Sequence, residues 1–323
     1  MGLNPVAPRP GRWKMIKILV VVILVAIIAI SAVGIVDNNY GINYGGYNSF
    51  SNSPFLTLTA NITHPSPQAN FTYGYMSPNL WDYYSGNGTA SIYAYSNSSV
   101  KEDANITSFN NSLSIFGYPS EHFTYGIPMP LQTVYVSNLS SFVSYDIKKI
   151  SNQVINDVAY DMFLGQNNTI QDEVERMLLD HMTNRNWVNG SGLTAVIPIT
   201  VNGTIFYPTW NIGISRSASG SFPLYTFVPP ESLFNNSSAS VNISFTPFLK
   251  YLEEKSLVSP AQSIIRLGIG SEFSYVTIGQ SNIYYSFWLY SYFVINGTDY
   301  QIVHPAGNTA MPVNPPILEA RPR

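Results

Sequence analysis

Acidic residues recur at alternate positions between residues 156 and 180, and their spacing could support acid–base chemistry. Asp161 lies on the polar side of a period-two pattern whose other side is apolar, which is typical of a half-buried strand. The turn-forming segment Gly165–Asn168 follows, so a second strand could return antiparallel. Glu173 and Glu175 would then share one face of the sheet with Asp161. The sequence therefore predicts paired carboxyl groups on an open face.

Two other interpretations of the second acidic segment remain open. Apolar residues recur at helical spacing over Thr169–Met182, so the segment also fits an amphipathic helix with its acids in solvent. The residues of that apolar stripe are Ile170, Val174, Met177 and Leu178. In the other interpretation the segment is a surface strand whose acids have no special role.

Three segments carry a resemblance to a known family: Val158–Phe163, Glu173–Leu179 and Gly270–Phe273. Together they resemble the paired strand motif and the Gly-Thr-Glu segment of glycoside hydrolase family 12, the small retaining endo-β-glucanases. Weaker matches lie at Asn79–Trp81, Gly117–Pro119, Thr209–Trp210 and Tyr225–Phe227. The resemblance runs in order over residues 71–295, and it is to archaeal-type members that are membrane-anchored or secreted.

This resemblance implies an all-β fold: a β-jelly-roll sandwich of two antiparallel sheets with a concave substrate cleft and one short helix. It implies that Glu175 is the nucleophile, Glu272 the acid/base and Asp161 the residue that supports the nucleophile. A retaining glycosidase needs its two carboxyl groups about 5–5.5 Å apart. Substrate contacts would come from Trp81, Asn79, Met177 and Tyr118. The expected substrate is a β-1,4-linked glucan, such as cellulose, mixed-linkage glucan or xyloglucan, cleaved internally.

Two positions depart from the family pattern beside the expected nucleophile. Arg176 stands where the family has an apolar residue, and Leu179 stands where it has Trp. On the predicted strand, Arg176 would point into the core. These departures keep an alternative open: a non-catalytic, glycosylated cell-surface jelly roll that binds polysaccharide or packs in the cell envelope.

The composition limits the class of protein. With 323 residues, 45% of them hydrophobic, the chain can bury one sizeable core as a single all-β domain. A formal net charge of −3 gives no basic footprint for nucleic acid. The chain has no Cys, and its four His residues lack ligand spacing, so we expect no disulfide, no metal site and no cofactor. We expect a monomer whose partner is a β-glucan polysaccharide.

An uncharged apolar segment, residues 18–36, follows a basic segment, residues 1–17. At 1.5 Å per residue its length is enough to cross a bilayer once, so we expect a transmembrane anchor with the N-terminus inside. A cleaved signal segment is the alternative, because Ala32–Gly34 offers small residues. Residues 37–52 would form a flexible linker and residues 304–323 a Pro-rich tail, with the glycoside hydrolase domain at 53–303.

Patterns along that domain predict its main elements. Alternation predicts strands at Leu56–Ala60, Ala90–Tyr95, Val134–Val136, Ala195–Ile199, Ile265–Glu272 and Tyr284–Ile295. Thr246–Glu254 is the one helix that we expect, with the Thr246 hydroxyl as its cap and Pro247 at its first position.

The sequence also predicts where the domain lies. Every Asn-x-Ser/Thr acceptor follows the apolar segment, so the domain should be exported, either at the extracellular face of the membrane or secreted. Protease added to intact cells should therefore remove the domain and spare only the anchor, which immunoblotting of the cells would check. Full protection of the domain would contradict this topology.

Overall fold

The computed structural model describes residues 53–61, 63–64, 66–80, 88–106, 117–150, 154–180, 191–216, 221–230, 238–275 and 283–303. Within these ranges the side chains at 106, 148–150, 154–156, 176–180, 273–275, 283 and 285 are not described. All of these residues belong to one compact unit, Ser51–Arg323.

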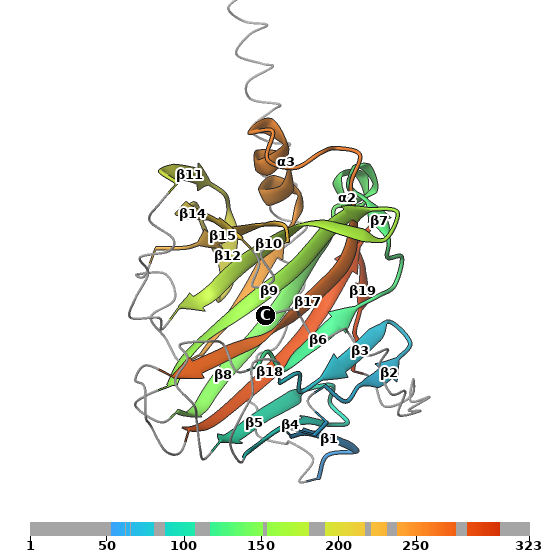
Figure 1. Ribbon diagram of the computed structural model, residues 1–323, viewed down its shortest axis with the longest axis vertical. Coiled ribbons are helices and arrows are strands. Elements are labelled where there is room, and N and C mark those ends of the chain that lie inside the picture. Colours follow the sequence, from blue (N-terminus) through green and yellow to red (C-terminus); the bar gives the residue numbers. More distant parts are fainter. Residues whose placement is uncertain are drawn as a thin grey trace, which may run out of the picture. The chain divides into compact units, whose positions relative to one another are not determined.

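Two β-sheets form this unit (Figure 1). The nine-stranded sheet has the order β1-β4-β5-β18-β8-β16-β12-β13, and β19 pairs with β18. Its strands are β1 (Leu56–Ala60), β4 (Gly88–Ala94), β5 (Val100–Ile106), β8 (Ser140–Ile150), β12 (Ile199–Val201), β13 (Thr204–Phe206), β16 (Ser238–Ser244), β18 (Ile283–Ile295) and β19 (Thr298–Tyr300).

The ten-stranded sheet has the order β11-β14-β15-β10-β9-β17-β6-β3-β2, and β7 pairs with β17. Its strands are β2 (Ala69–Phe71), β3 (Gly74–Ser77), β6 (Ser120–Phe123), β7 (Met129–Pro130), β9 (Val154–Gln166), β10 (Thr169–Asp180), β11 (Leu193–Val196), β14 (Thr209–Arg216), β15 (Pro223–Val228) and β17 (Ser263–Tyr275). The predicted all-β sandwich of two sheets is confirmed.

The core lies between the two sheets and is rich in aromatic rings. Phe123 of β6 stacks on Phe293 of β18 with ring centroids 4.7 Å apart, so the contact joins the two layers. The Tyr160 hydroxyl of β9 donates to Ser141 Oγ of β8 at 2.8 Å, and this bond satisfies two buried polar groups inside the apolar layer. The core-facing side of the ten-stranded sheet is therefore held in place by packing against the nine-stranded sheet.

The ladder between β9 and β10 decides between the open interpretations of the second acidic segment. Residues Thr169–Asp180 form a strand, so the helical alternative is wrong. Register pairs Glu175 with Asp161 and Glu173 with Phe163, which places both glutamates on the face of Asp161. Val158, Tyr160 and Met162 of β9 are buried under the sheet that β10 continues. A helix at residues 170–178 could not pair with β9, so strand pairing outweighs the helical spacing of the apolar residues there.

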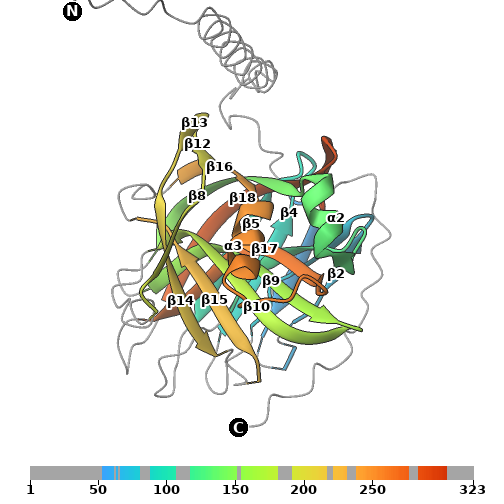
Figure 2. The same cartoon turned by 90° about the horizontal axis from the view of Figure 1, so that it is seen from above.

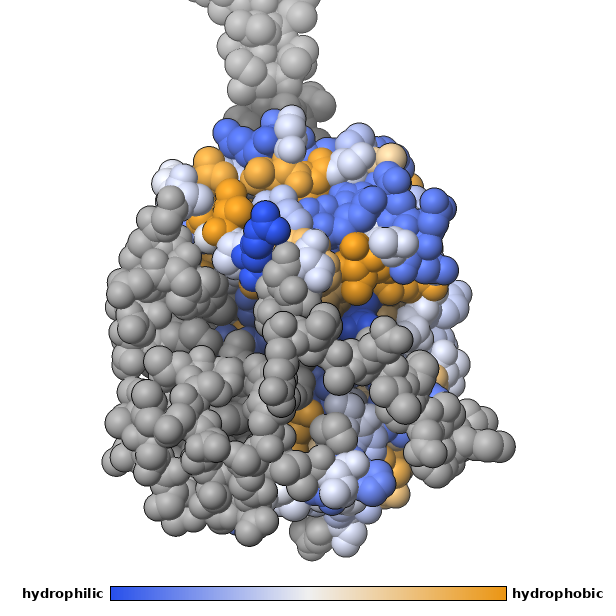
Figure 3. All heavy atoms as spheres, in the orientation of Figure 1, coloured by the Kyte–Doolittle hydropathy of each residue, from blue (hydrophilic) through white to orange (hydrophobic). Residues whose placement is uncertain are grey.

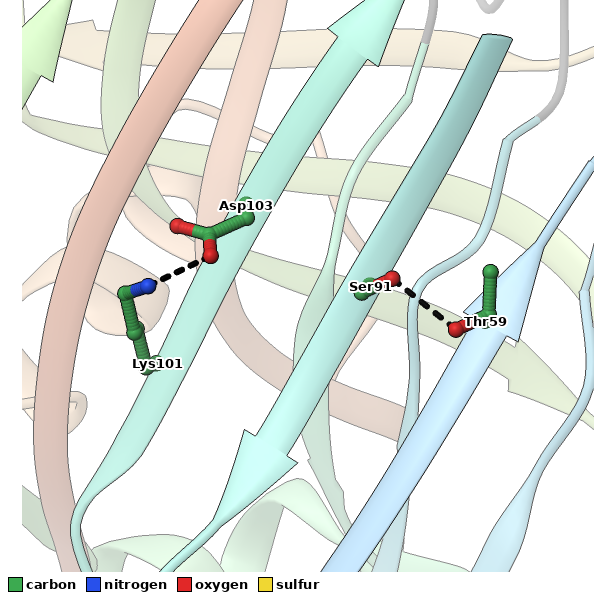
Figure 4. Close-up of polar contacts among 4 residues, drawn as sticks. All are labelled: Thr59, Ser91, Lys101 and Asp103. Atoms are coloured by element: carbon green, nitrogen blue, oxygen red, sulfur yellow. Dashed lines mark hydrogen bonds and ion pairs between the residues drawn. The ribbon is translucent and has the colours of Figure 1, made fainter. Parts of the chain in front are cut away.

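One edge of the nine-stranded sheet is held by local polar contacts (Figure 4). Thr59 of β1 and Ser91 of β4 are directly paired, and their hydroxyl oxygens lie 2.9 Å apart. Lys101 and Asp103 form an ion pair two residues apart on β5. Such contacts contribute little free energy at a partly exposed edge, so register there depends mainly on the buried face.

The structure describes two short helices where the sequence predicted one. The helix α3 (Thr246–Glu254) matches the prediction, but the Thr246 hydroxyl is not its cap and donates instead to the Val134 carbonyl. The second helix, α2 (Leu131–Ser137), replaces the predicted strand Val134–Val136. Leu131, Val134 and Ser137 are buried on one face of this helix at a spacing of three residues. The predicted strand rested on the alternation of only three residues, Val134–Val136, which is too short to show that helical spacing. Figure 2 shows both helices among the labelled elements.

Two further expectations about strands are corrected. The predicted strand Ala195–Ile199 is divided between β11 and β12, which belong to different sheets, because Pro198 cannot donate to a ladder. The sheets are also not wholly antiparallel, since β10 and β15 pair in parallel. The excursion of the chain through β11 to β14 brings β15 back beside β10 in the same direction.

The described surface mixes apolar and polar residues. In the view of Figure 3, hydrophobic residues lie beside hydrophilic ones and form no continuous apolar band over the described part of that face. Among the described residues, no helix has the length and apolar character that crossing a bilayer requires. The predicted anchor at residues 18–36 lies outside them and stays a prediction, as do the linker and the tail.

Two buried carboxyl groups lie between the sheets, on the side of the ten-stranded sheet opposite Asp161 and Glu175. Glu121 of β6 accepts a hydrogen bond from Ser291 of β18 at 2.6 Å, and burial raises its pKa to about 8. Burial likewise raises the pKa of Glu102, and the Glu121 carboxyl adds to that shift. Neither carboxyl oxygen of Glu102 has a hydrogen-bond partner among the described residues. Both groups therefore favour the protonated form in the folded protein.

These groups predict that the fold is more stable in acid. A carboxyl whose pKa is higher in the folded state binds its proton more tightly there, so its contribution is complete below about pH 4.5 and falls as pH rises toward 8. The loss from one such group is about 1.4 kcal/mol per pH unit within that window. Urea unfolding at pH 5 and pH 8 should show this decline in the wild type and a smaller one in Glu121→Gln.

The matched control is Glu254→Gln, which changes an exposed carboxyl at the end of α3. It should keep the wild-type dependence on pH. An equal decline in wild type and Glu121→Gln would show that Glu121 does not titrate in this range.

Candidate active site

Three adjacent strands, β17, β9 and β10, position the acidic face of the ten-stranded sheet. β9 presents Asp157 and Asp161 on the side opposite the core, because side chains alternate along a strand. β10 adds Glu175 directly opposite Asp161, and β17 adds Glu272 directly opposite Asp157. With Glu173, which lies on the same face two residues before Glu175, five carboxyl groups from three strands lie on one face.

The central cluster consists of Asp157, Glu175 and Glu272. One carboxylate oxygen of each lies within 4.8 Å of the others. The three side chains are almost fully buried, with exposed fractions of 0%, 7% and 8% respectively. Like charges this close in a dry setting cannot all be ionised at low cost, so the cluster must hold at least one proton near neutral pH.

Burial raises the pKa of Glu272 well above its ordinary value, and the nearby carboxyl groups of Glu175 and Asp157 raise it further. The pKa of Asp161 is also raised, first by burial and then by Glu173 and Glu175, while Arg266 opposes the shift. Asp161 forms its side-chain hydrogen bond with Glu173. Glu272 is therefore suited to carry a proton where an ordinary glutamate would have lost it.

Neighbouring groups hold the carboxyls in place. The Thr226 hydroxyl of β15 donates to Glu175 Oε2 at 3.2 Å, and Thr226 is itself buried. A hydrogen bond of this kind favours the ionised carboxylate and fixes its direction. The parallel pairing of β10 with β15 sets Thr226 directly opposite Glu175, so this contact depends on the strand order.

A histidine lies on the same face, across β17 from Asp161. His122 of β6 stacks on Tyr75 of β3 with centroids 4.5 Å apart, and its Nε2 lies 2.8 Å from Ser120 Oγ. Burial lowers the pKa of His122 to about 3, with Arg266 adding to that effect, so the ring is neutral near pH 7. Gly268 makes room for the ring, because a Cβ there would lie 2.9 Å from His122 Nδ1.

The cluster of three carboxyl groups could in chemical terms also hold a hard cation, which prefers carboxylate oxygens. An acidic cluster alone does not indicate a metal, and proton sharing accounts for the same arrangement. We assign no metal here, and the expectation of no metal site stays a prediction.

The chain matches the model of glycosyl hydrolase family 12 over residues 73–289, which is more than half of its length. The chain belongs to glycosyl hydrolase family 12. No curated protein matches it in sequence. Family membership makes glycoside hydrolysis the chemistry of this chain at the level of class.

Solved structures of the family share its fold. A family 12 xyloglucanase from Bacillus licheniformis, solved with a ligand, is 19% identical, with a TM-score of 0.54 over 74% of this chain and 99% of that one. Endoglucanase 3 from Trichoderma harzianum is 17% identical, with a TM-score of 0.53 over 77% of this chain and 100% of that one. At these identities the likeness establishes the jelly-roll fold and no more.

The four residues predicted to contact substrate differ in what the structure describes of them. Tyr118 is 1% exposed, and its hydroxyl donates to the Ala159 carbonyl at 3.0 Å, so the contacts described are those of a packing residue. Asn79 is half-buried, and its Oδ1 accepts from Ser66 Oγ at 2.9 Å. Trp81 lies outside the described residues, and so do the side chains of Met177 and Arg176.

Sequence reasoning missed three members of this face: Asp157, Thr226 and His122. Asp157 falls on the same period-two face as Asp161, so the pattern could have marked it. Thr226 lies 51 residues after Glu175, and only the strand order makes them neighbours. His122 lacks metal-ligand spacing, and its place beside the acidic face follows from strand pairing, which a spacing criterion does not detect.

Thr226 provides a direct test of how Glu175 is held. Thr226→Val keeps the β-branched shape but removes the hydroxyl that donates to Glu175. A hydrogen bond to a charged group contributes about 1.5–3 kcal/mol, so kcat on soluble β-glucan should fall by about tenfold or more. An unchanged kcat would show that the contact does not support the carboxylate.

Proposed function

We propose that this chain is an endo-acting glycoside hydrolase that cleaves β-1,4-linked glucan with retention of anomeric configuration. The observation that carries the proposal is the short separation of Glu175 and Glu272, whose nearest oxygens lie within 4.8 Å. Retaining enzymes keep their carboxyls about 5–5.5 Å apart, whereas inverting enzymes need about 6.5–9.5 Å to admit a water. The spacing favours retention.

Glu175 acts as the nucleophile in this proposal. Its ionised carboxylate, held by Thr226, attacks the anomeric carbon while the bond to the leaving oxygen breaks. Glu272 gives its proton to that oxygen. In the second step Glu272, now a carboxylate, takes a proton from water, and the water oxygen displaces Glu175 from the sugar.

The raised pKa of Glu272 supports its role as the acid. Asp161 lies directly opposite Glu175 on the neighbouring strand, where it would hold the nucleophile in position and tune its basicity. The proposal includes the location of the domain, which works outside the cell, either tethered to the membrane or secreted. Its substrate is cellulose-type glucan, mixed-linkage glucan or xyloglucan. The non-catalytic alternative, which the departures at Arg176 and Leu179 kept open, is not favoured, because a binding module does not need three buried carboxyl groups with oxygens within 4.8 Å of one another.

Three Glu→Gln variants test the roles. Glu175→Gln keeps shape but removes the nucleophile, so turnover on carboxymethyl-cellulose or β-glucan should nearly vanish while the melting temperature stays close to wild type. Glu272→Gln should lose least on substrates whose leaving group needs no proton. Proton NMR of the first product should show the β-anomer.

Glu173→Gln is the matched control, since Glu173 lies on the same face two residues before Glu175. It should lose far less activity than Glu175→Gln. If Glu175→Gln retains the wild-type rate, the catalytic assignment is wrong and the binding module replaces it.

A further inference from the structure

Asp157 is the member of the carboxyl cluster that the two-step reaction does not use. Its side chain is completely buried, and one of its oxygens lies within 4.8 Å of an oxygen of both Glu175 and Glu272. The β9–β17 ladder sets Asp157 directly opposite Glu272, so the contact is fixed by backbone register and not by a mobile loop. Burying a carboxyl group costs free energy, which makes an unused one at this position unexpected.

Two neighbouring carboxyl groups in a dry site influence each other's protons. When one is ionised, the other holds its proton more strongly, because two negative charges at this distance repel. Glu175 must be ionised to act as the nucleophile, so the acid proton belongs to Glu272 or Asp157. Only Glu272 has the role of delivering it to the leaving oxygen in the reaction proposed above.

We propose that Asp157 is a positioning residue of this reaction, whose negative charge keeps the acid/base proton on Glu272. The inference rests on the proposed function, since it assigns Asp157 a part in the same reaction. It has two consequences: Glu272 remains an acid at higher pH, and after it has given up the proton it is a stronger base toward water.

The other titratable groups near the cluster do not replace Asp157. Besides Asp157, the carboxyl groups that raise the pKa of Glu272 are Glu175 and Glu173 on β10 and Asp161 on β9. Tyr118, just before β6, also interacts electrostatically with Glu272, whereas Arg266 of β17 acts on Asp161 and on His122 of β6. Asp161 lies four positions farther along β9, where it hydrogen-bonds Glu173 and Arg266 offsets its charge. His122 is neutral near pH 7. Burial, Glu175 and then Asp157 are the largest causes of the raised pKa of Glu272.

The test is a titration of Glu272 by carbon-13 NMR in protein labelled at the glutamate side-chain carboxyls. The signal that disappears in Glu272→Gln identifies the residue. In the wild type it should titrate well above the ordinary range for glutamate, and in Asp157→Asn its midpoint should fall by about one pH unit or more. Asp299→Asn, which changes an exposed aspartate on β19, is the matched control and should leave it unmoved.

A midpoint that moves no further in Asp157→Asn than in Asp299→Asn would overturn the proposal. If Asp157→Asn does not fold, the coupling can be measured from the other side, because the interaction between two titrating groups is reciprocal. In Glu272→Gln with labelled aspartate, the Asp157 midpoint should fall by a similar amount, and an unmoved midpoint would again overturn the proposal. Neither titration uses a substrate, so the result is independent of whether the glucan activity is found.

Discussion

The crowding of like charges on one face of a buried sheet is the constraint on which the site depends. Asp157, Glu175 and Glu272 each bring a carboxylate oxygen within 4.8 Å of the others because three neighbouring strands present them on one face. A slip of one residue in either ladder would turn one set of carboxyls into the core. The apolar layer beneath, with Tyr160 and Phe123 joining the sheets, makes such a slip costly.

That constraint also explains why the surrounding groups are so specific. Carboxyls that repel one another need fixed hydrogen bonds and shared protons to stay together. Thr226 donates to Glu175, and Asp161 shares a hydrogen bond with Glu173. Gly268 leaves space beside Asp161 for a neutral histidine, so no cation is brought against the cluster from β6. The carboxyl groups of the site therefore stay close together only because some of them are protonated and others are hydrogen-bonded.

The same chemistry recurs between the sheets, where it has no part in the proposed reaction. Glu102 and Glu121 are buried carboxyls that favour their neutral forms, and Ser291 donates to one of them. A fold that buries acids in two separate places is better matched to a proton-rich medium than to an alkaline one.

The first strand of the acidic face and the family could be predicted from the sequence alone, whereas the second strand stayed open to a helical interpretation. The alternation at 157–163 and the turn at Gly165–Asn168 predict the β9–β10 hairpin, because local side-chain periodicity and turn chemistry act over a few residues. Together with the motifs that resemble family 12, they were enough to select Glu175 and Glu272. Local patterns failed where tertiary packing outweighed them, as in the helix at Leu131–Ser137.

Which distant residues become neighbours depends on the packing of the whole chain. The parallel entry of β15 beside β10 brings Thr226 to Glu175, and the β9–β17 ladder brings Asp157 to Glu272, across separations in sequence that no local pattern records. The pKa shifts follow from those same long-range contacts and from burial, which are properties of the packed chain. The sequence therefore supplied the carboxyl groups, and folding supplied the distances and the burial that determine what those groups can do.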